Sequence, residues 1–296
     1  MLVNPQDLAH LATALHLSEG AVGLSEPNPR VGCVLVSAEG QVLGQGHTQA
    51  VGGAHAEVVA LRAAQAQGHP TAGSTAFVTL EPCSHFGRTP PCCDALLTAG
   101  VARVVVASRD PNPLVAGQGL ARLRAAGVVV DLLPPDHPLA VAVRGLNVGF
   151  FSRMERGLPW VRMKVAASMD GTTALHNGAS QWITGPAARA DGHAWRRRAT
   201  AVLTGIGTVE ADNPRLDVRL VPTTVQPWRV VVDARLAIVP TAQVLQPPGQ
   251  VLVYTAALPK ASAEQRTALN ALGVVVVDAP GGTGGKVDLK AMLHCA

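Results

Sequence analysis

One short stretch of the chain concentrates residues that bind metals. Residues 80–93 read LEPCSHFGRTPPCC and hold three of the five cysteines in the 296-residue sequence. A second stretch, AHAEVVAL, places His55 and Glu57 in the first turn of an expected helix. One imidazole and two thiolates leave the fourth tetrahedral position of a zinc ion open for water, as catalytic zinc requires. His55, Cys83 and a cysteine at the start of the next helix are therefore candidate zinc ligands.

Glu57 adds the second requirement of a hydrolytic zinc site. A carboxylate beside the metal-bound water can carry its proton to a leaving amine. The combination of H-x-E with a later P-C and a second cysteine is the signature of zinc nucleobase deaminases. The alternatives are a structural zinc site or unrelated core residues. Structural sites usually have four protein ligands, which favours the catalytic interpretation.

The composition excludes several other classes of protein. Hydrophobic residues make up 48% of the chain and charged residues 15%, which argues against disorder. No apolar run is long enough to span a bilayer, and residues 1–17 lack the pattern of a signal peptide. A net charge of +4 fits an anionic small molecule without requiring nucleic acid. Clustered cysteines in odd number indicate a reducing compartment. We expect a cytoplasmic enzyme with no nucleic-acid or membrane partner.

Strand and helix patterns alternate along the chain, which predicts α/β sheets layered by helices. In the first part we expect an N-terminal amphipathic helix, strands at 31–37, 41–47, 75–80, 103–108 and 128–133, and helices at 55–68, 93–100 and 119–127. In the second part we expect strands at 160–168, 201–205, 228–233, 250–255 and 274–278, and helices at 186–198 and near 261–272. The predicted organisation is a first domain at 1–145, a linker at 146–159 and a second domain at 160–296.

The motifs of the first domain resemble one enzyme family. HAEVVAL and TLEPCSHFGRTPPCCDALLTAGVARVVVASRDPNP resemble the deaminase half of the bifunctional riboflavin-biosynthesis family, the diaminohydroxyphosphoribosylaminopyrimidine deaminase/aminouracil phosphate reductases. The resemblance covers about residues 5–150. It implies a cytidine-deaminase-like three-layer α/β/α fold and Zn²⁺. It also implies that water replaces an exocyclic amine of a ribosylated diaminopyrimidinone phosphate.

The resemblance also assigns the cysteines and four substrate contacts. Neighbouring residues at a helix start diverge, so only one of Cys92 and Cys93 should face the metal, and the family pattern selects Cys92. Cys33 lies in an alternating apolar strand and is expected in the core. The substrate contacts implied by the resemblance are Asn28 at the pyrimidine or ribose, His47 at the pocket rim, and His85 and Arg88 at the phosphate.

These substrate contacts have simpler alternatives. His85 and Arg88 lie in a loop that its own hydrogen bonds could hold, and an Asn before Pro often caps a turn. A planar guanidinium nevertheless matches phosphate geometry, which favours a phosphate contact for Arg88.

The second domain resembles the reductase half of the same family, which is related in fold to dihydrofolate reductase. The resemblance rests on VRMKVAASMDG, GASQWITGP and LTGIGTVEADNPRLDVR. It implies reduction of the ribosyl group to ribityl with hydride from NADPH. The glycine turn at 204–208 follows a strand and opens a helix, where backbone N–H groups can face a phosphate. It does not match GxGxxG, so no Rossmann domain is predicted.

Residue roles in the second domain follow from the resemblance alone. The implied NADPH contacts are Ala166, Trp182, Thr208 and Asp212. The implied substrate contacts are Ser180, Arg196, Leu216 and Arg219, with the arginines near the phosphate. Lys164 and Asp170 are expected as polar wall residues, and Trp182 has the alternative of a core aromatic. The family's glycine-containing acidic motif is not found before residue 296, so we expect an incomplete reductase domain with an unpaired sheet edge.

Three functions compete at this point. The first is the riboflavin-pathway deaminase with a reductase domain, acting on a small phosphorylated pyrimidine as a homo-oligomer. The second is a zinc nucleoside or nucleic-acid deaminase. The eight residues SHFGRTPP between Cys83 and Cys92, where nucleic-acid deaminases have two, argue against it. The third is a non-catalytic, metal-stabilised binding module, which would not need Glu57.

Overall fold

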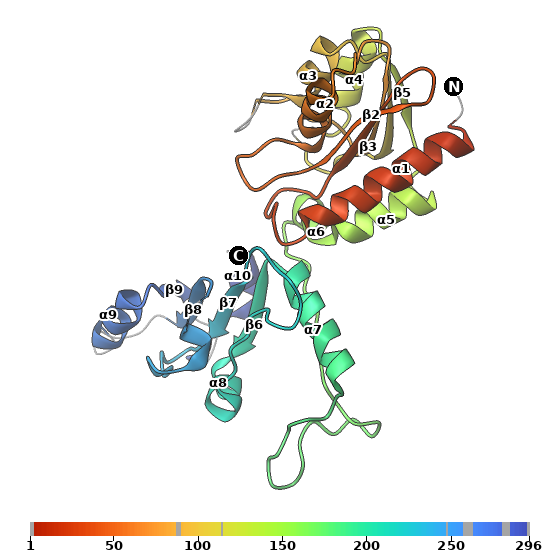
Figure 1. Ribbon diagram of the computed structural model, residues 1–296. Coiled ribbons are helices and arrows are strands. Elements are labelled where there is room, and N and C mark those ends of the chain that lie inside the picture. Colours follow the sequence, from red (N-terminus) through yellow and green to blue (C-terminus); the bar gives the residue numbers. More distant parts are fainter. Residues whose placement is uncertain are drawn as a thin grey trace. The chain divides into compact units, whose positions relative to one another are not determined.

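The computed structural model of the chain divides into two units, Met1–Trp160 and Val161–Ala296 (Figure 1). The structure describes residues 3–86, 90–113, 115–246, 248–256, 263–279 and 285–294. Each unit is built around one sheet with its own hydrophobic cores. Within the described ranges, none of the helices has the length and apolar character needed to cross a membrane.

The sheet of the first unit has five strands in the order β2-β1-β3-β4-β5. They are β1 (Gly32–Val36), β2 (Val42–His47), β3 (Thr75–Leu80), β4 (Arg103–Ser108) and β5 (Val129–Leu132). β1 is antiparallel to β2 and β3, whereas β3, β4 and β5 are parallel. All five predicted strands are confirmed. The carboxyl ends of β3 and β4 meet at one sheet edge, a usual place for a ligand site.

Helices cover both faces of this sheet. One face carries α2 (Ala56–Ala66), α3 (Cys92–Thr98) and α4 (Gln118–Ala125), and the other carries α1 (Pro5–Ser18) and α5 (Pro138–Leu146). The alternation of β1 serves both faces, since Cys33 and Leu35 join the first core and Val34 and Val36 the second. The predicted three-layer α/β/α fold is confirmed. A short 3-10 turn (Glu19–Ala21) follows α1, and α6 (Val148–Arg156) buries Phe151 in the first core.

Two glycines of β2 let α2 lie directly on the sheet. A Cβ at Gly44 would lie 2.2 Å from the carbonyl oxygen of Ala60, and one at Gly46 would lie 2.8 Å from that of Ala56. On the helix, the buried alanines Ala56, Ala60 and Ala64 recur every four residues. Small residues on both sides therefore fix the distance between helix and sheet. This determines where the first turn of α2 lies.

The sheet of the second unit is parallel, in the order β6-β7-β8-β9. Its strands are β6 (Ala201–Gly205), β7 (Trp228–Val232), β8 (Val251–Ala256) and β9 (Val275–Ala279). Its helices are α7 (Pro186–Arg198), α8 (Ile206–Asp212), α9 (Ala263–Ala271) and α10 (Leu289–His294), with a 3-10 turn at Gln243–Leu245. Side chains of α8 and α9 share one core, and Met292 of α10 is buried in a second core with Val230 and Tyr254.

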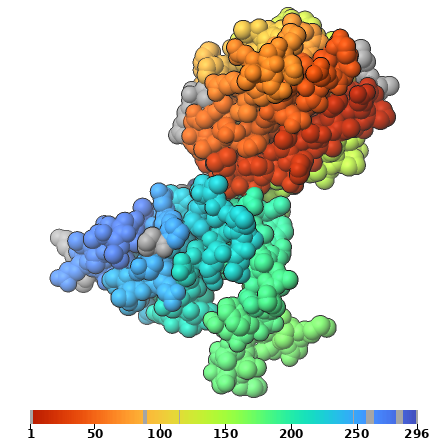
Figure 2. Space-filling view, viewed as in Figure 1, coloured from red at the N-terminus to blue at the C-terminus, as the bar shows by residue number. Residues whose placement is uncertain are grey.

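The prediction of a strand at 160–168 is wrong, because the structure forms no strand there. Arg162 lies over the ring of Trp195 in α7, 3.7 Å from its centroid, whereas Val161, Met163 and Val165 are exposed. The alternation typical of a strand is present, but a strand needs a backbone partner, and no described strand pairs with this segment. In Figure 2 the green residues that follow it stand out from the rest of their unit.

Candidate metal centre and substrate sites

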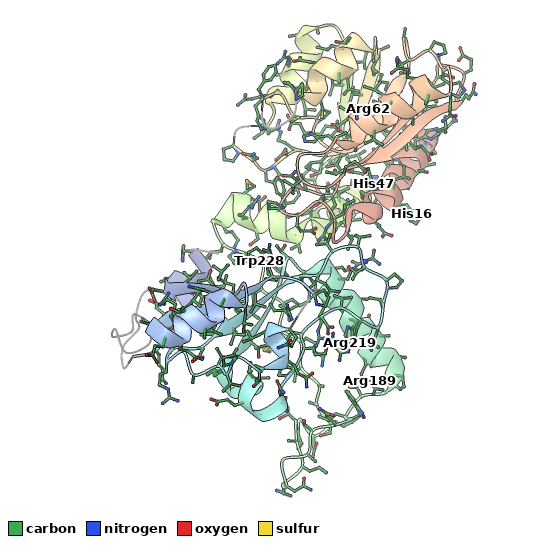
Figure 3. The ribbon with its side chains drawn as sticks, turned by 60° about the vertical axis from the view of Figure 1, so that its left-hand side comes forward. His16, His47, Arg62, Arg189, Arg219 and Trp228 are labelled. Atoms are coloured by element: carbon green, nitrogen blue, oxygen red, sulfur yellow. The ribbon has the colours of Figure 1, made fainter. Side chains whose placement is uncertain are left out.

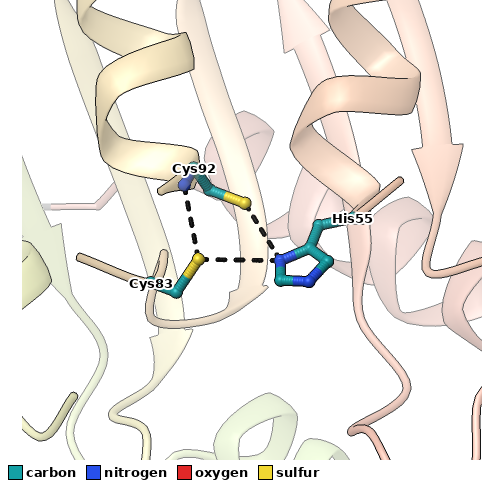
Figure 4. A group of neighbouring side chains, drawn as sticks. All are labelled: His55, Cys83 and Cys92. Atoms are coloured by element: carbon teal, nitrogen blue, oxygen red, sulfur yellow. Dashed lines mark hydrogen bonds between the residues drawn. The ribbon is translucent and has the colours of Figure 1, made fainter. Parts of the chain in front are cut away.

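Three segments of the first unit bring His55, Cys83 and Cys92 together (Figure 4). His55 is the N-cap residue of α2, Cys83 follows β3, and Cys92 is the first residue of α3. The structure therefore unites the three predicted zinc ligands, which are separated by up to 37 positions in the chain.

The distances fit a zinc ion. Nδ1 of His55 lies 3.2 Å from Sγ of Cys92 and 3.6 Å from Sγ of Cys83. All three ligand atoms lie within 4.8 Å of one another. Tetrahedral coordination with Zn–N near 2.0 Å and Zn–S near 2.3 Å requires N···S separations of roughly 3.5 Å. One nitrogen and two sulfurs are also the ligand types that zinc prefers.

Hydrogen bonds prepare one cysteine as a thiolate. A hydrogen bond from the thiol of Cys92, together with those from His55 and the Cys92 N–H, lowers the pKa of Cys83 to about 4. The same hydrogen bond from the Cys92 thiol to Cys83, together with burial, raises the pKa of Cys92. The pKa of His55 is raised, chiefly by its hydrogen bond to Cys83. A thiolate beside an imidazole is a state that binds a metal cation.

Glu57 lies in the first turn of α2 and is 3% exposed. Its carboxyl group interacts electrostatically with Cys83 and His55, so the side chain lies close to the ligand group. Burial raises the pKa of Glu57 to about 7, and the negative charge of Cys83 adds to this effect. A carboxyl group with a pKa near neutrality is suited both to accept and to donate a proton.

The two remaining described cysteines of this unit are core residues. Cys33 is fully buried in β1. Cys93 is also buried, and its thiol donates to the carbonyl oxygens of Pro82, at 3.4 Å, and Gly119, at 3.6 Å. Burial raises the pKa of Cys93 to about 12, so it stays a neutral thiol. The predicted distinction between Cys92 and Cys93 matches this geometry.

The predicted substrate residues of the first unit occupy different settings. Asn28 is half-buried, and its N–H donates to Ser25 over 2.8 Å within a turn. His47 ends β2 (Figure 3), and its Nδ1 lies 3.1 Å from the carbonyl oxygen of Thr48. His85 is exposed. Arg88 lies outside the described residues. The roles of these four residues stay predictions.

Two acidic residues near the metal ligands were missed by the sequence analysis. Glu81 and Asp110 are 4% and 7% exposed, and each lies just beyond the carboxyl end of a parallel strand. Burial raises the pKa of Asp110 to about 6, and the charges of Glu81 and Cys83 contribute. Their positions after β3 and β4 were the available signal, because both strands end at the edge that holds Cys83.

In the second unit, three of the predicted substrate residues lie around Asp217. Nη1 of Arg196 donates to the carbonyl oxygen of Asp217 at 3.1 Å, and Arg219 forms an ion pair with its carboxylate at 2.6 Å. Leu216 precedes Asp217 with φ of 57°, a left-handed value, and its side chain is buried in the core. Figure 3 labels Arg219, whose N–H donates to His193 of α7.

The other predicted residues of this unit lie elsewhere on its surface. Trp182 is 67% exposed and stacks under Arg189, so it is not a core aromatic. Thr208 and Asp212 are exposed on α8. The remaining four lie on the segment before α7, where Ala166 and Ser180 are half-buried and Lys164 and Asp170 are exposed. The described contacts join none of these residues to the group around Asp217.

A three-layer α/β/α sheet with a His, two cysteines and a buried glutamate at its edge defines a zinc-dependent deaminase domain. Residues 4–108 match the family of the cytidine and deoxycytidylate deaminase zinc-binding region, and residues 159–295 match the RibD C-terminal domain. The chain belongs to the RibD family of riboflavin biosynthesis proteins, and its second unit is of the dihydrofolate-reductase-like class.

Relatives over most of the chain support this assignment. The riboflavin biosynthesis protein RibD of Escherichia coli K12 is 46% identical in an alignment of 258 residues, which covers 83% of this chain and 68% of the relative. For Aquifex aeolicus RibD the identity is 43%, over 82% of this chain and 66% of the relative. The chain thus spans about two thirds of these relatives.

Solved structures show the same fold. Acinetobacter baumannii RibD, 41% identical, superposes with a TM-score of 0.83 over 98% of this chain and 76% of that chain. A diaminohydroxyphosphoribosylaminopyrimidine deaminase/5-amino-6-(5-phosphoribosylamino)uracil reductase from Thermotoga maritima, 32% identical, gives 0.77 over 95% and 82%. These likenesses cover both units of the chain.

Proposed function

We propose that the first unit deaminates a ribosylated diaminopyrimidinone phosphate in riboflavin biosynthesis, releasing ammonia. The observation that carries this proposal is the buried Glu57 carboxylate beside three converging zinc-type ligands. The family membership supports the substrate class. His55, Cys83 and Cys92 would hold the zinc ion, which would supply Lewis-acid activation of a water molecule.

The chain's own residues supply the proton transfers and the positioning. Glu57 takes a proton from the attacking water and delivers it to the leaving amine, for which a pKa of about 7 is suited. Asn28 and His47 are proposed to orient the pyrimidine and ribose. His85 and Arg88 are proposed to meet the phosphate, since both lie in the loop between the two ligand cysteines.

The test is ammonia release by the zinc-loaded chain with the pyrimidinone phosphate. Glu57→Gln keeps the side-chain size but removes the proton carrier, so release should fall at least about 100-fold. Zinc content should not change. The matched control is Glu39→Gln, which alters an exposed glutamate in the turn between β1 and β2 and should leave the rate unchanged. Wild-type rates in the Glu57 variant would refute the mechanism.

We also propose that the second unit reduces the ribosyl group of the deaminated product with NADPH. Family membership supports this activity, and Arg196 and Arg219 are proposed to face the substrate phosphate. NADPH consumption by the full chain, with and without the deaminated product, tests the proposal. Product-dependent, saturable consumption is expected, and it would also refute the expectation of an incomplete reductase. No consumption would overturn this proposal and leave the deaminase proposal intact.

The cellular compartment and the oligomeric state are part of the same proposal. Cys33, Cys83, Cys92 and Cys93 form no disulfide bonds, which fits a reducing compartment such as the cytoplasm. The predicted homo-oligomer stays a prediction, and its mass in solution would test it.

A further inference from the structure

The carboxylate of Glu81 receives an unusual number of backbone hydrogen bonds. It lies between β3 and the ligand Cys83 and is 4% exposed. Oε1 accepts from the N–H groups of Gly119, at 3.1 Å, and Leu120, at 3.3 Å. Oε2 accepts from those of Gly117, at 2.9 Å, and Asp110, at 3.3 Å. One side chain thus holds four backbone donors that are 29 to 39 positions away.

These bonds replace a cap that α4 lacks. The first N–H groups of a helix have no partner within the helix, and a side-chain oxygen at the N-cap usually accepts from them. The N-cap of α4 is Gly117, which has no side chain, and its first turn holds no acidic residue. Glu81 therefore provides both the acceptor and the negative charge that this helix end favours. The docking of α4 depends on the residue two positions before a zinc ligand.

The helix held in this way contacts both ligand segments. A Cβ at Gly119 would lie 2.0 Å from the carbonyl oxygen of Pro82, so α4 rests directly on the residue before Cys83. Arg122 donates to the carbonyl oxygen of Ser84, the residue after Cys83, at 3.3 Å. The contact with the second segment is made by Cys93, whose thiol donates to the carbonyl oxygen of Gly119 at 3.6 Å.

Arg122 strengthens the link to the second ligand segment. It forms an ion pair with Asp94 in the first turn of α3, the helix that Cys92 begins. The first two turns of α4 therefore contact residues next to Cys83 and residues next to Cys92. A shift of α4 would change the separation of the two sulfurs.

We propose that Glu81 is a positioning residue of the metal centre, which acts through α4 to set the geometry of Cys83 and Cys92. It does not touch the metal or the substrate. The inference deepens the proposed deaminase function and rests on it for the identity of the metal. Partners that orient metal ligands typically contribute 10- to 100-fold to metal affinity, roughly.

The experiment compares Glu81→Gln with Asp7→Asn in the full chain. A glutamine keeps the size of Glu81, but its NH2 group has no acceptor and would face two N–H donors. Asp7 is the matched control, because it is also a buried carboxylate, 5% exposed, that caps a helix of the same unit. It pairs with Arg103 and contacts neither ligand segment. Zinc affinity is measured by competition with a chromophoric chelator, alongside thermal unfolding.

The expected result separates positioning from simple stability. Both variants should unfold at lower temperature. Only Glu81→Gln should also bind zinc more weakly, by roughly 10- to 100-fold. Glu81→Gln should also release ammonia with a lower kcat than the wild-type chain at saturating zinc. Wild-type zinc affinity in Glu81→Gln, with stability lowered as in Asp7→Asn, would overturn the proposal.

A second variant covers the case in which Glu81→Gln does not fold. Arg122→Gln changes a side chain that is 44% exposed and removes its contacts with Ser84 and Asp94. A roughly tenfold loss of zinc affinity supports the proposal, and unchanged affinity overturns it. Ammonia release by the wild-type chain is measured separately. Its absence would refute the deaminase function, whereas the zinc affinities still decide the role of Glu81.

Discussion

The two sheets of this chain are covered to very different degrees. In the first unit, β1 is buried along its whole length, and four of the six residues of β4 are buried. In the second unit, β7 and β8 are mostly buried, but no residue of the edge strand β6 is, and Leu203 is 50% exposed. Helices on both faces enclose the first sheet, whereas β6 and the segment before α7 present apolar side chains to solvent.

This difference extends to the candidate sites. The metal centre is formed by residues at the ends of buried strands and the starts of packed helices, so its side chains converge. The predicted cofactor and substrate residues of the second unit are spread over α7, α8 and two segments without strand or helix, and only the group around Asp217 brings some of them together. A site gathers where its supporting elements are packed on both sides, because packing restricts the rotamers of its side chains.

The largest expected effect is that of zinc removal, which should act on the first unit and leave the second unchanged. A chelator should abolish ammonia release, and it should destabilise the first unit alone. Zinc at 1,000 times its Kd stabilises the folded state by about 4.1 kcal/mol, and chelation removes this contribution.

Two probes distinguish the units in this experiment. Three of the four tryptophans, Trp182, Trp195 and Trp228, lie in the second unit, and Trp160 is the last residue of the first, so their fluorescence mainly follows the second unit. Hydrogen exchange of the amides in β1 and β3 follows the first. An equal loss of stability reported by both probes would contradict the expected difference between the two units.

A smaller effect is expected from matched strand substitutions. Leu35 in β1 is fully buried, and Leu203 in β6 is half-exposed. Leu35→Ala should destabilise the first unit by about 3 kcal/mol, since it leaves a cavity in a packed core. Leu203→Ala should change the stability of the second unit by no more than about 0.5 kcal/mol. Denaturant unfolding measures both, and equal losses would show that β6 is covered in solution.

The smallest expected effect is a pH dependence in the stability of the second unit. Burial, helped by the positive charges of Arg196 and Arg219 and opposed by Asp217, lowers the pKa of His193 to about 4. The unfolded chain binds this proton near pH 6.5, so stability is present above that value. It is lost as the pH falls towards 4. Solvent screens part of this shift, since the Arg219 side chain is 45% exposed, so the expected loss is about 1 kcal/mol.

The variant His193→Asn isolates this contribution. Its side-chain oxygen can still accept the N–H of Arg219, but it does not titrate. Tryptophan fluorescence in denaturant at several pH values should show a shallower loss for the variant between pH 6.5 and 4. The same slope in both proteins would assign the effect to other groups.

Much of the first unit was predictable because its signals are local. The alternation of β1, the glycines of β2 and the alanines of α2 each lie within a few residues, and together they determine two packed faces. Regular spacing also predicted α7 and the strands β6 to β9. The segment 160–168 shows where this fails, since its alternating Val161, Met163 and Val165 carry the signal of a strand but find no pairing partner.

The sequence by itself determined the chemistry of the metal centre. His55, Glu57 and Cys83 were identifiable from residue type and spacing, because zinc selects thiolates and imidazoles and the motif keeps them at the ends of elements. The choice of Cys92 over Cys93 came from the family resemblance. Only the tertiary structure decided how they are held. Glu81 and α4 are separated by more than 35 positions, and hydrogen bonds between such distant segments leave no periodic trace in the sequence.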